Sequence, residues 1–162
     1  MLRKIVLSSL VVFTAFVGTA QAKEMSSRLG VGFRNAYSFE LPAIAAVYYP
    51  SSEFGVVGAL GIDTQENNSK FAFTGGVRRI IFKEEGMNFF MGGLLSFLSS
   101  ETAGSTDSGF ELSAVVGGEF FMHGLENLGF NFETGAGVTN LRKVRFRTLG
   151  DHMFRAGMIF YF

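Results

Sequence analysis

The chain has 162 residues and balanced charge, with 14 Lys and Arg against 14 Asp and Glu, so the formal net charge is zero. It therefore lacks the basic field that nucleic-acid binding requires, and we expect no nucleic-acid partner. There is no cysteine. Disulfides, thiolate metal sites, cysteine nucleophiles and a lipid-modified cysteine near the mature N-terminus are thereby excluded.

The N-terminal segment is typical of a secretory signal. Two positive residues precede an apolar run over residues 5–17, and the small-residue sequence Ala20-Gln21-Ala22 follows. The run is shorter than the roughly 20 residues that a membrane-spanning helix needs. We expect cleavage after Ala22, which makes residues 1–22 the secretory signal and residues 23–162 one mature domain.

After this segment the hydrophobicity is spread by alternation. Mean hydropathy is +0.29 with 20 Phe and 21 Gly, but no later stretch is apolar enough for a membrane helix. Large apolar residues instead recur at every second position, the pattern of strands with one apolar face. The strands predicted in this way are Arg28–Asn35, Leu41–Tyr49, Phe54–Asp63, Lys70–Ile81, Met87–Phe97, Phe110–Phe120, Leu128–Val138 and Phe154–Phe162.

The connections between these strands differ in length. The tight, turn-like ones are Pro50–Glu53, Lys83–Gly86 and Met122–Asn127; the longer polar ones are Thr64–Ser69, Ser99–Ser108 and Asn140–Asp151, with Tyr37–Glu40 as a short exception. Eight strands of about ten residues, with short turns at one end and longer loops at the other, indicate an outer-membrane barrel. An even number of strands predicts that both termini are periplasmic.

The second face of the strands separates a barrel from a β-sandwich. In a sandwich this face would meet water and be rich in Lys, Glu, Gln and Thr. Here it carries mostly Gly, Ala and Ser with isolated charges. Small side chains around a narrow axis, with large ones outside, fit a tight barrel in lipid. The sequence predicts an all-β fold: a closed antiparallel up-and-down transmembrane β-barrel of eight strands.

The last strand ends in alternating apolar residues that we interpret as an assembly signal: Phe154, Met158, Phe160 and Phe162. On this strand, and on the layout of the mature chain, the sequence resembles small outer-membrane barrels of the OmpA transmembrane-domain, OmpX and opacity-protein class. The resemblance implies integral insertion in the bacterial outer membrane by the barrel assembly machinery. It says little about function. We expect a monomer.

Isolated charges on the predicted inner face form the main candidate site: Arg34, Arg78, Glu111, Glu119, Glu133 and Arg155. Three arginines and three glutamates can neutralise one another, and an unpaired charge in so confined an interior would be expensive. One interpretation is a salt-bridged plug, since eight strands leave room for little more than side chains. The other is a charged lining that passes ions or accepts a ligand.

A basic run lies in the last long connection, with Arg142, Lys143, Arg145 and Arg147. It could bind phosphates of lipopolysaccharide by charge pairing. The alternative is a solvated hairpin that extends the strands.

Catalysis and metal binding have little support in the sequence. His123 lies in a predicted turn beside Gly124, and His152 has no serine beside it, unlike the His-x-Ser arrangement of lipid A deacylase barrels. Two distant histidines without cysteine do not form a metal site. We expect no catalytic residues, no metal and no cofactor.

The sequence therefore favours a non-enzymatic barrel with a structural or surface-interaction role. A narrow or lateral small-solute channel is the alternative, and a lipid A-modifying enzyme is less favoured.

Overall fold

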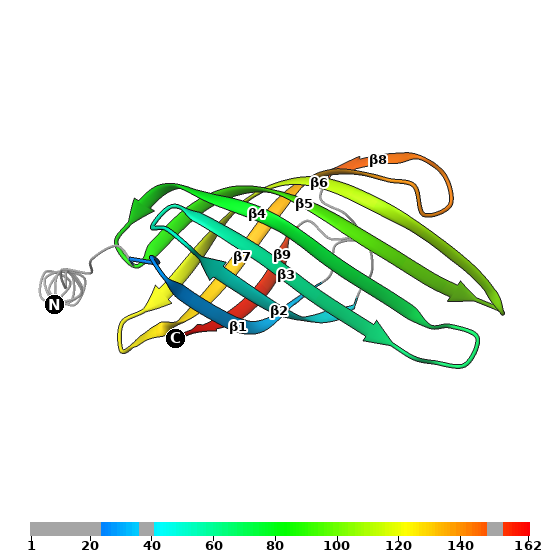
Figure 1. Cartoon of the computed structure of the whole chain (residues 1–162), viewed down its shortest axis with the longest axis horizontal. Helices are drawn as coiled ribbons and strands as arrows, with labels where there is room; N and C mark the ends of the chain where they lie inside the picture. The colour runs from blue at the N-terminus through cyan, green and yellow to red at the C-terminus, as the bar shows by residue number, and fades with distance from the viewer. Residues whose placement is uncertain (1–23, 36–40, 149–153) are drawn as a thin grey trace, which may run out of the picture.

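The computed structural model describes residues 24–35, 41–148 and 154–162, and the strands in this part form one antiparallel sheet (Figure 1). The strands are β1 (Arg28–Asn35), β2 (Pro42–Tyr49), β3 (Phe54–Asp63), β4 (Lys70–Glu84), β5 (Met87–Thr102), β6 (Ser105–Met122), β7 (Leu125–Thr139), β8 (Arg145–Thr148) and β9 (Arg155–Tyr161).

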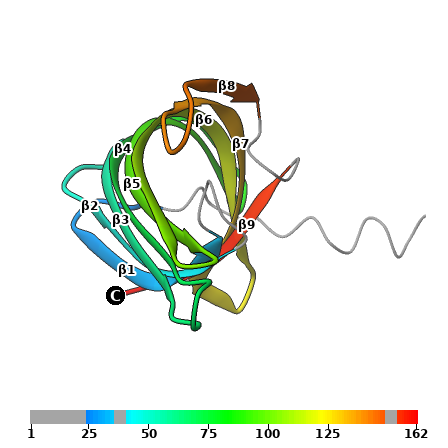
Figure 2. The same cartoon turned by 90° about the vertical axis from the view of Figure 1, so that its right-hand side faces the viewer.

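The sheet closes on itself because every strand except the short β8 pairs with a neighbour on both sides. β1 pairs with β2 and with β9, while β7 pairs with β6 and with β9. β8 and β9 both lie against β7, one along 136–139 and the other along 128–133, and so occupy the same place in the wall. The predicted closed eight-stranded barrel is thus confirmed, and Figure 2 shows the ring of strands end-on.

Alternation places side chains as expected from the sequence. On β3, Val57 and Ala59 are buried inside the barrel, whereas Val56, Leu60 and Ile62 are exposed on its outer surface. The same division holds for β2, although its sequence is apolar on both faces: its inward positions from Ala43 to Tyr49 are buried. In the described part of the chain, no helix is long and apolar enough to cross a membrane.

The two ends of the barrel differ. Glu24, Phe162 and the tight turns after β2, β4 and β6 lie at one end, which we call the terminal end (Figure 1). The connections after β3, β5 and β7 lie at the opposite loop end. Strands β4 to β7 are longer than β1 and β2, so one side of the wall projects further at the loop end.

Two predicted loops were wrong. Most of Ser99–Ser108 continues β5 and β6 to a two-residue turn at Ala103 and Gly104, where φ is 51° and 78°. Positive φ at both positions is the geometry that hairpin turns require. Part of Asn140–Asp151 forms β8. These segments were missed because serine, threonine and charged residues on both faces hide the strand period from an analysis based on hydrophobicity.

Candidate functional site: the charged interior of the barrel

All six predicted interior charges lie inside the barrel. Their exposed fractions are 9% or less, lowest for Glu119 at 0%. They come from five strands: Arg34 from β1, Arg78 from β4, two glutamates from β6, Glu133 from β7 and Arg155 from β9.

The most enclosed ion pair joins Arg78 to Glu119. Arg78 Nη2 donates to Glu119 Oε2 at 3.0 Å and to the Tyr161 hydroxyl at 2.7 Å. That hydroxyl in turn donates to Glu119 Oε1 at 2.8 Å, which closes a three-residue ring of hydrogen bonds. The guanidinium carbon lies 4.9 Å from the ring centre of Tyr49 and 4.8 Å from that of Phe90. Arg78 is therefore held by an opposite charge, a phenol and two aromatic rings.

A second ion pair joins Arg34 to Glu133. Both side chains are less than a tenth exposed. Arg155 lies directly opposite Glu133 in the register of β7 and β9 and is 6% exposed. Two arginines thus lie on the same side of one glutamate: Arg155 is on β9, the neighbour of β7, and Arg34 is on β1, one strand further on.

The third ion pair corrects the expectation for Arg147. The sequence assigned this residue to an outer loop facing lipopolysaccharide, but β8 places it opposite Gly137 on the inward face. Its Nη2 donates to Glu111 Oε2 at 2.9 Å, and its side chain is 10% exposed. The physical reason is the strand period: once residues 145–148 pair with β7, alternate side chains turn inward.

The three ion pairs share one geometry that the sequence analysis missed. Each arginine faces a glycine on the neighbouring strand and pairs with a glutamate one strand further on. The facing pairs are Arg34 with Gly157, Arg78 with Gly92, and Arg147 with Gly137. A Cβ added to Gly157 or Gly92 would lie 3.1 or 3.2 Å from the Cβ of the facing arginine. The glycines therefore provide the space through which the long side chains cross.

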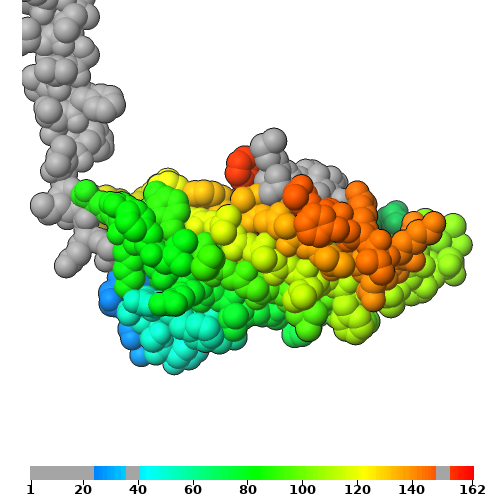
Figure 3. Space-filling model, turned by 90° about the horizontal axis from the view of Figure 1, so that it is seen from above, coloured from blue at the N-terminus to red at the C-terminus, as the bar shows by residue number. Residues whose placement is uncertain are grey.

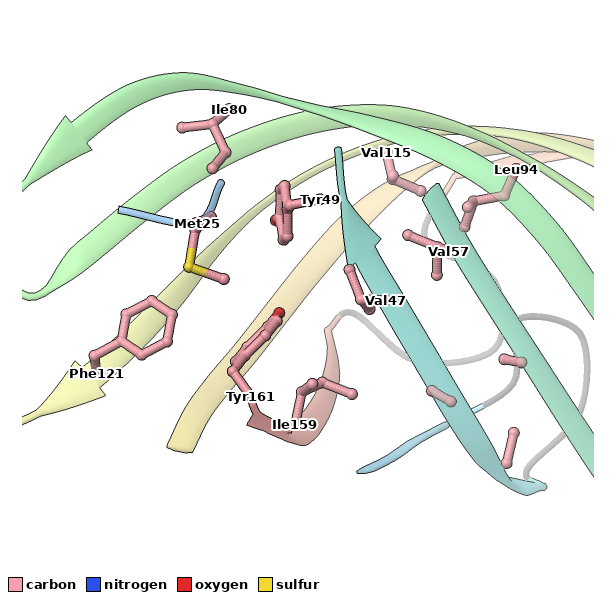
Figure 4. Close-up of a cluster of buried hydrophobic side chains, with 13 residues drawn as sticks. Met25, Val47, Tyr49, Val57, Ile80, Leu94, Val115, Phe121, Ile159 and Tyr161 are labelled. Carbon is pink, nitrogen blue, oxygen red and sulfur yellow. The ribbon is translucent and has the colours of Figure 1, made fainter. Parts of the chain in front are cut away.

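Apolar side chains close the interior at the terminal end. Met25 is fully buried and packs with Ile80, Phe121 and Tyr161 across this end, as Figure 4 shows. A salt bridge between Glu24 and Lys83, at 3.8 Å, ties the segment that carries Met25 to the wall.

A smaller apolar cluster lies toward the loop end. It is formed by Leu41, Ala72 and Leu98, with Leu141 packed against it. Asn140 holds the chain beside β6 through two hydrogen bonds. Its side-chain oxygen accepts one from the backbone N–H of Phe110 at 2.6 Å, and its own backbone N–H donates the other to the carbonyl oxygen of Phe110. The charged interior thus adjoins both apolar clusters.

Comparisons with known proteins concern the fold. No family model and no curated protein matches the sequence. The N-terminal β-barrel domain of Pseudomonas aeruginosa OprF superposes with a TM-score of 0.62 and 12% identity, over 85% of this chain and 98% of that chain. It is an eight-stranded outer-membrane barrel. This chain has the fold of an eight-stranded outer-membrane β-barrel.

Two further solved structures match at lower TM-scores. Neisserial surface protein A gives 0.40 with 15% identity, over 83% of this chain and 91% of that chain. Ail, the attachment invasion locus protein of Yersinia pestis, gives 0.42 with 15% identity, over 85% of this chain and 100% of that chain.

The remaining basic residues of the predicted lipopolysaccharide contact belong to the orange segment of Figure 3, at the loop end. Arg142, Lys143 and Arg145 are exposed. Arg142 Nε donates to Asp107 at 2.5 Å, so β6 already neutralises part of this charge.

The residues of the predicted assembly signal point outward. Phe154, Met158, Phe160 and Phe162 are between 42% and 70% exposed. They form an apolar stripe on the outer surface of the last strand, available to lipid or to another protein.

One of the two histidines lies within the described residues. His123 lies in the exposed turn between β6 and β7, and His152 lies outside the described residues. Within the described ranges, no group of three or more His, Cys, Asp or Glu side chains could hold a metal ion.

Proposed function

We propose that the protein is an integral barrel of the bacterial outer membrane with a structural or surface-interaction role, no enzymatic activity, and a lumen closed by paired charges. One observation carries the proposal: the barrel exposes large apolar side chains on its outer surface and buries three ion pairs inside. A water-soluble protein of this size would arrange them the other way round.

Aromatic contacts mark the two borders of the apolar surface. Toward the loop end, the Phe97 ring contacts those of Phe71 and Phe110. Toward the terminal end, contacts pair Phe82 with Phe89, Phe120 with Phe132, and Phe160 with Phe162. Ten residues of β6 separate Phe110 from Phe120, which corresponds to about 25 Å in a strand tilted by about 40°. An outer-membrane barrel has an apolar band of about this height, flanked by aromatic girdles.

The interior supports a plug better than a pore. Three ion pairs cross the lumen, and buried apolar side chains of two clusters pack around and beside them. Each arginine is held close to a glutamate, so a permeating ion would have to displace a buried pair, which is strongly unfavourable.

At the loop end, the exposed residues Arg142, Lys143 and Arg145 support a contact with lipopolysaccharide, whose phosphates suit arginine and lysine donors. The proposal has three further parts: the barrel assembly machinery inserts the protein, both termini are periplasmic, and the protein is a monomer. They are consistent with the apolar last strand and with a sheet that is closed within one chain.

Refolding and conductance test the proposal together. A closed barrel keeps its hydrogen bonds in mild detergent, so unheated and boiled samples should migrate differently on a gel. In planar bilayers the refolded protein should give negligible current. A steady single-channel current whose ion selectivity changes in Glu133→Ala would favour the small-solute channel instead.

A further inference from the structure

The outer surface of the barrel contains a hollow with a volume of about 420 Å³. This lies within the range of small-molecule sites, roughly 300–1,000 Å³. Its outward-facing lining comes from β3 to β6 and is almost entirely apolar: Phe54, Val77, Arg79, Met91, Ala114 and Val116. In the register these residues form two adjacent rows, 54–79–91–116 and 77–93–114.

Gly93 lies beside the hollow, between two of its lining residues in the second row. It faces Val77 on one side and Ala114 on the other. A Cβ added to Gly93 would meet no atom within 4 Å. Packing within the barrel therefore does not require glycine here, unlike at the interior positions. Glycine within a strand often marks a place where another molecule approaches closely.

A second hollow of about 220 Å³ adjoins the first and shares Val116 with it. It lies toward the terminal end and is lined by apolar side chains that include Ile81, Phe89, Phe132 and Phe154. Two neighbouring apolar hollows on a membrane-facing wall offer room for two hydrocarbon chains.

Arg79 is a charged residue within this apolar surface. Its side chain is 69% exposed, and its Nη2 donates to Glu53 in the turn after β2, at 3.3 Å. The guanidinium is thus directed toward the terminal end, where long cationic side chains reach the membrane surface. A guanidinium has five N–H donors, so donors besides the one bound to Glu53 can meet a phosphate.

We propose that this surface binds one glycerophospholipid from the membrane leaflet at the terminal end. Its acyl chains would occupy the two hollows, and its phosphate diester would accept hydrogen bonds from Arg79. The inference rests on the proposed function, because only a membrane-inserted barrel presents this wall to lipid. Charge complementarity selects the occupant: the exposed Arg79 guanidinium has donors beyond the one bound to Glu53, and a phospholipid supplies both an anion for them and two chains for the hollows.

Native mass spectrometry of the refolded barrel, titrated with dioleoyl phosphatidylglycerol and separately with dioleoylglycerol, tests the site. Arg79→Gln keeps a donor for Glu53 and removes the charge. Gly93→Leu places a large side chain between Val77 and Ala114, two lining residues of the first hollow. Gly58→Leu is the matched control: Gly58 also has no atom within 4 Å of an added Cβ, but its neighbours Ala46 and Gly75 line neither hollow. Each variant is first checked for the heat-dependent gel shift.

The unmodified protein and Gly58→Leu should each retain one phospholipid, bound about tenfold more tightly than the diacylglycerol. Arg79→Gln should abolish this preference, and Gly93→Leu should weaken both lipids. A heat-shifted barrel that retains no phospholipid, or that forms a dimer disrupted by Gly93→Leu, would overturn the lipid site alone. Absence of the gel shift in the unmodified protein would overturn the proposed function and the site with it.

Discussion

The Glu119→Ala variant tests whether the buried ion pairs stabilise the barrel. Glu119 is fully buried and accepts hydrogen bonds from both Arg78 and Tyr161. Its removal leaves the Arg78 guanidinium, 4% exposed, between two aromatic rings without its carboxylate. The guanidinium would keep its hydrogen bond to the phenol oxygen of Tyr161, but this oxygen carries no compensating charge.

The expected loss in the free energy of unfolding is about 3–5 kcal/mol, the usual effect of breaking a buried pair from one side. The matched control is Glu53→Ala. Glu53 pairs with Arg79 at 3.3 Å, but the two side chains are 56% and 69% exposed. Pairs of this kind contribute about 1 kcal/mol or less, so the two variants should differ by at least about 2 kcal/mol.

Urea unfolding of the barrel in lipid vesicles measures both losses. The double variant Arg78→Met with Glu119→Leu should recover part of the loss, because no charge then remains unpaired. The reasoning is refuted if Glu119→Ala destabilises no more than Glu53→Ala, or if the double variant is less stable than Glu119→Ala.

Three further predictions concern maturation, assembly and packing. Intact-mass measurement of membrane-extracted protein should show a chain that begins at Lys23; retention of the first 22 residues would contradict the proposed cleavage. Deletion of Phe162 should reduce outer-membrane yield far more than deletion of Ser105, and equal yields would count against an assembly signal. Gly157→Val should lower the free energy of unfolding by about 1–3 kcal/mol, because its Cβ would lie 2.6 Å from a side-chain oxygen. Gly75→Val should leave the free energy of unfolding unchanged, because a Cβ at this position meets no atom within 4 Å. Equal urea midpoints for the two variants would refute the packing argument.

Much of the fold could be predicted because the alternation of large apolar residues with small or charged ones shows both where a strand lies and which of its side chains point outward. In β6, for example, Phe110, Leu112 and Phe120 are exposed outside while Glu111 and Glu119 are buried inside, as the pattern requires. Alternation fails where both faces are polar. The hairpin extension around Ser100 and the short strand β8 lie beyond the apolar band, so no hydrophobic period marks them.

The partners of the interior charges could not be predicted in the same way. Alternation says that Arg34 points inward, but not at what height it meets the charges of other strands, because the tilt and stagger of a closed sheet set that height. Arg34 and Glu133 lie 99 positions apart in sequence. Tyr161 was placed inward by the pattern, yet its bonds to Arg78 and Glu119 required the closed ring.

The facing glycines suggest why these particular pairs form. An arginine on a narrow inner face cannot extend sideways unless the next strand leaves it space. Gly157, Gly92 and Gly137 leave that space in front of the three paired arginines. A longer side chain at any of these glycines would force the arginine away from its glutamate. Formation of each ion pair therefore depends on the glycine as well as on the two charged residues. Inward arginine and inward glycine on adjacent strands are both visible in the sequence. Once strand register is known, this juxtaposition predicts that the counter-charge lies two strands away.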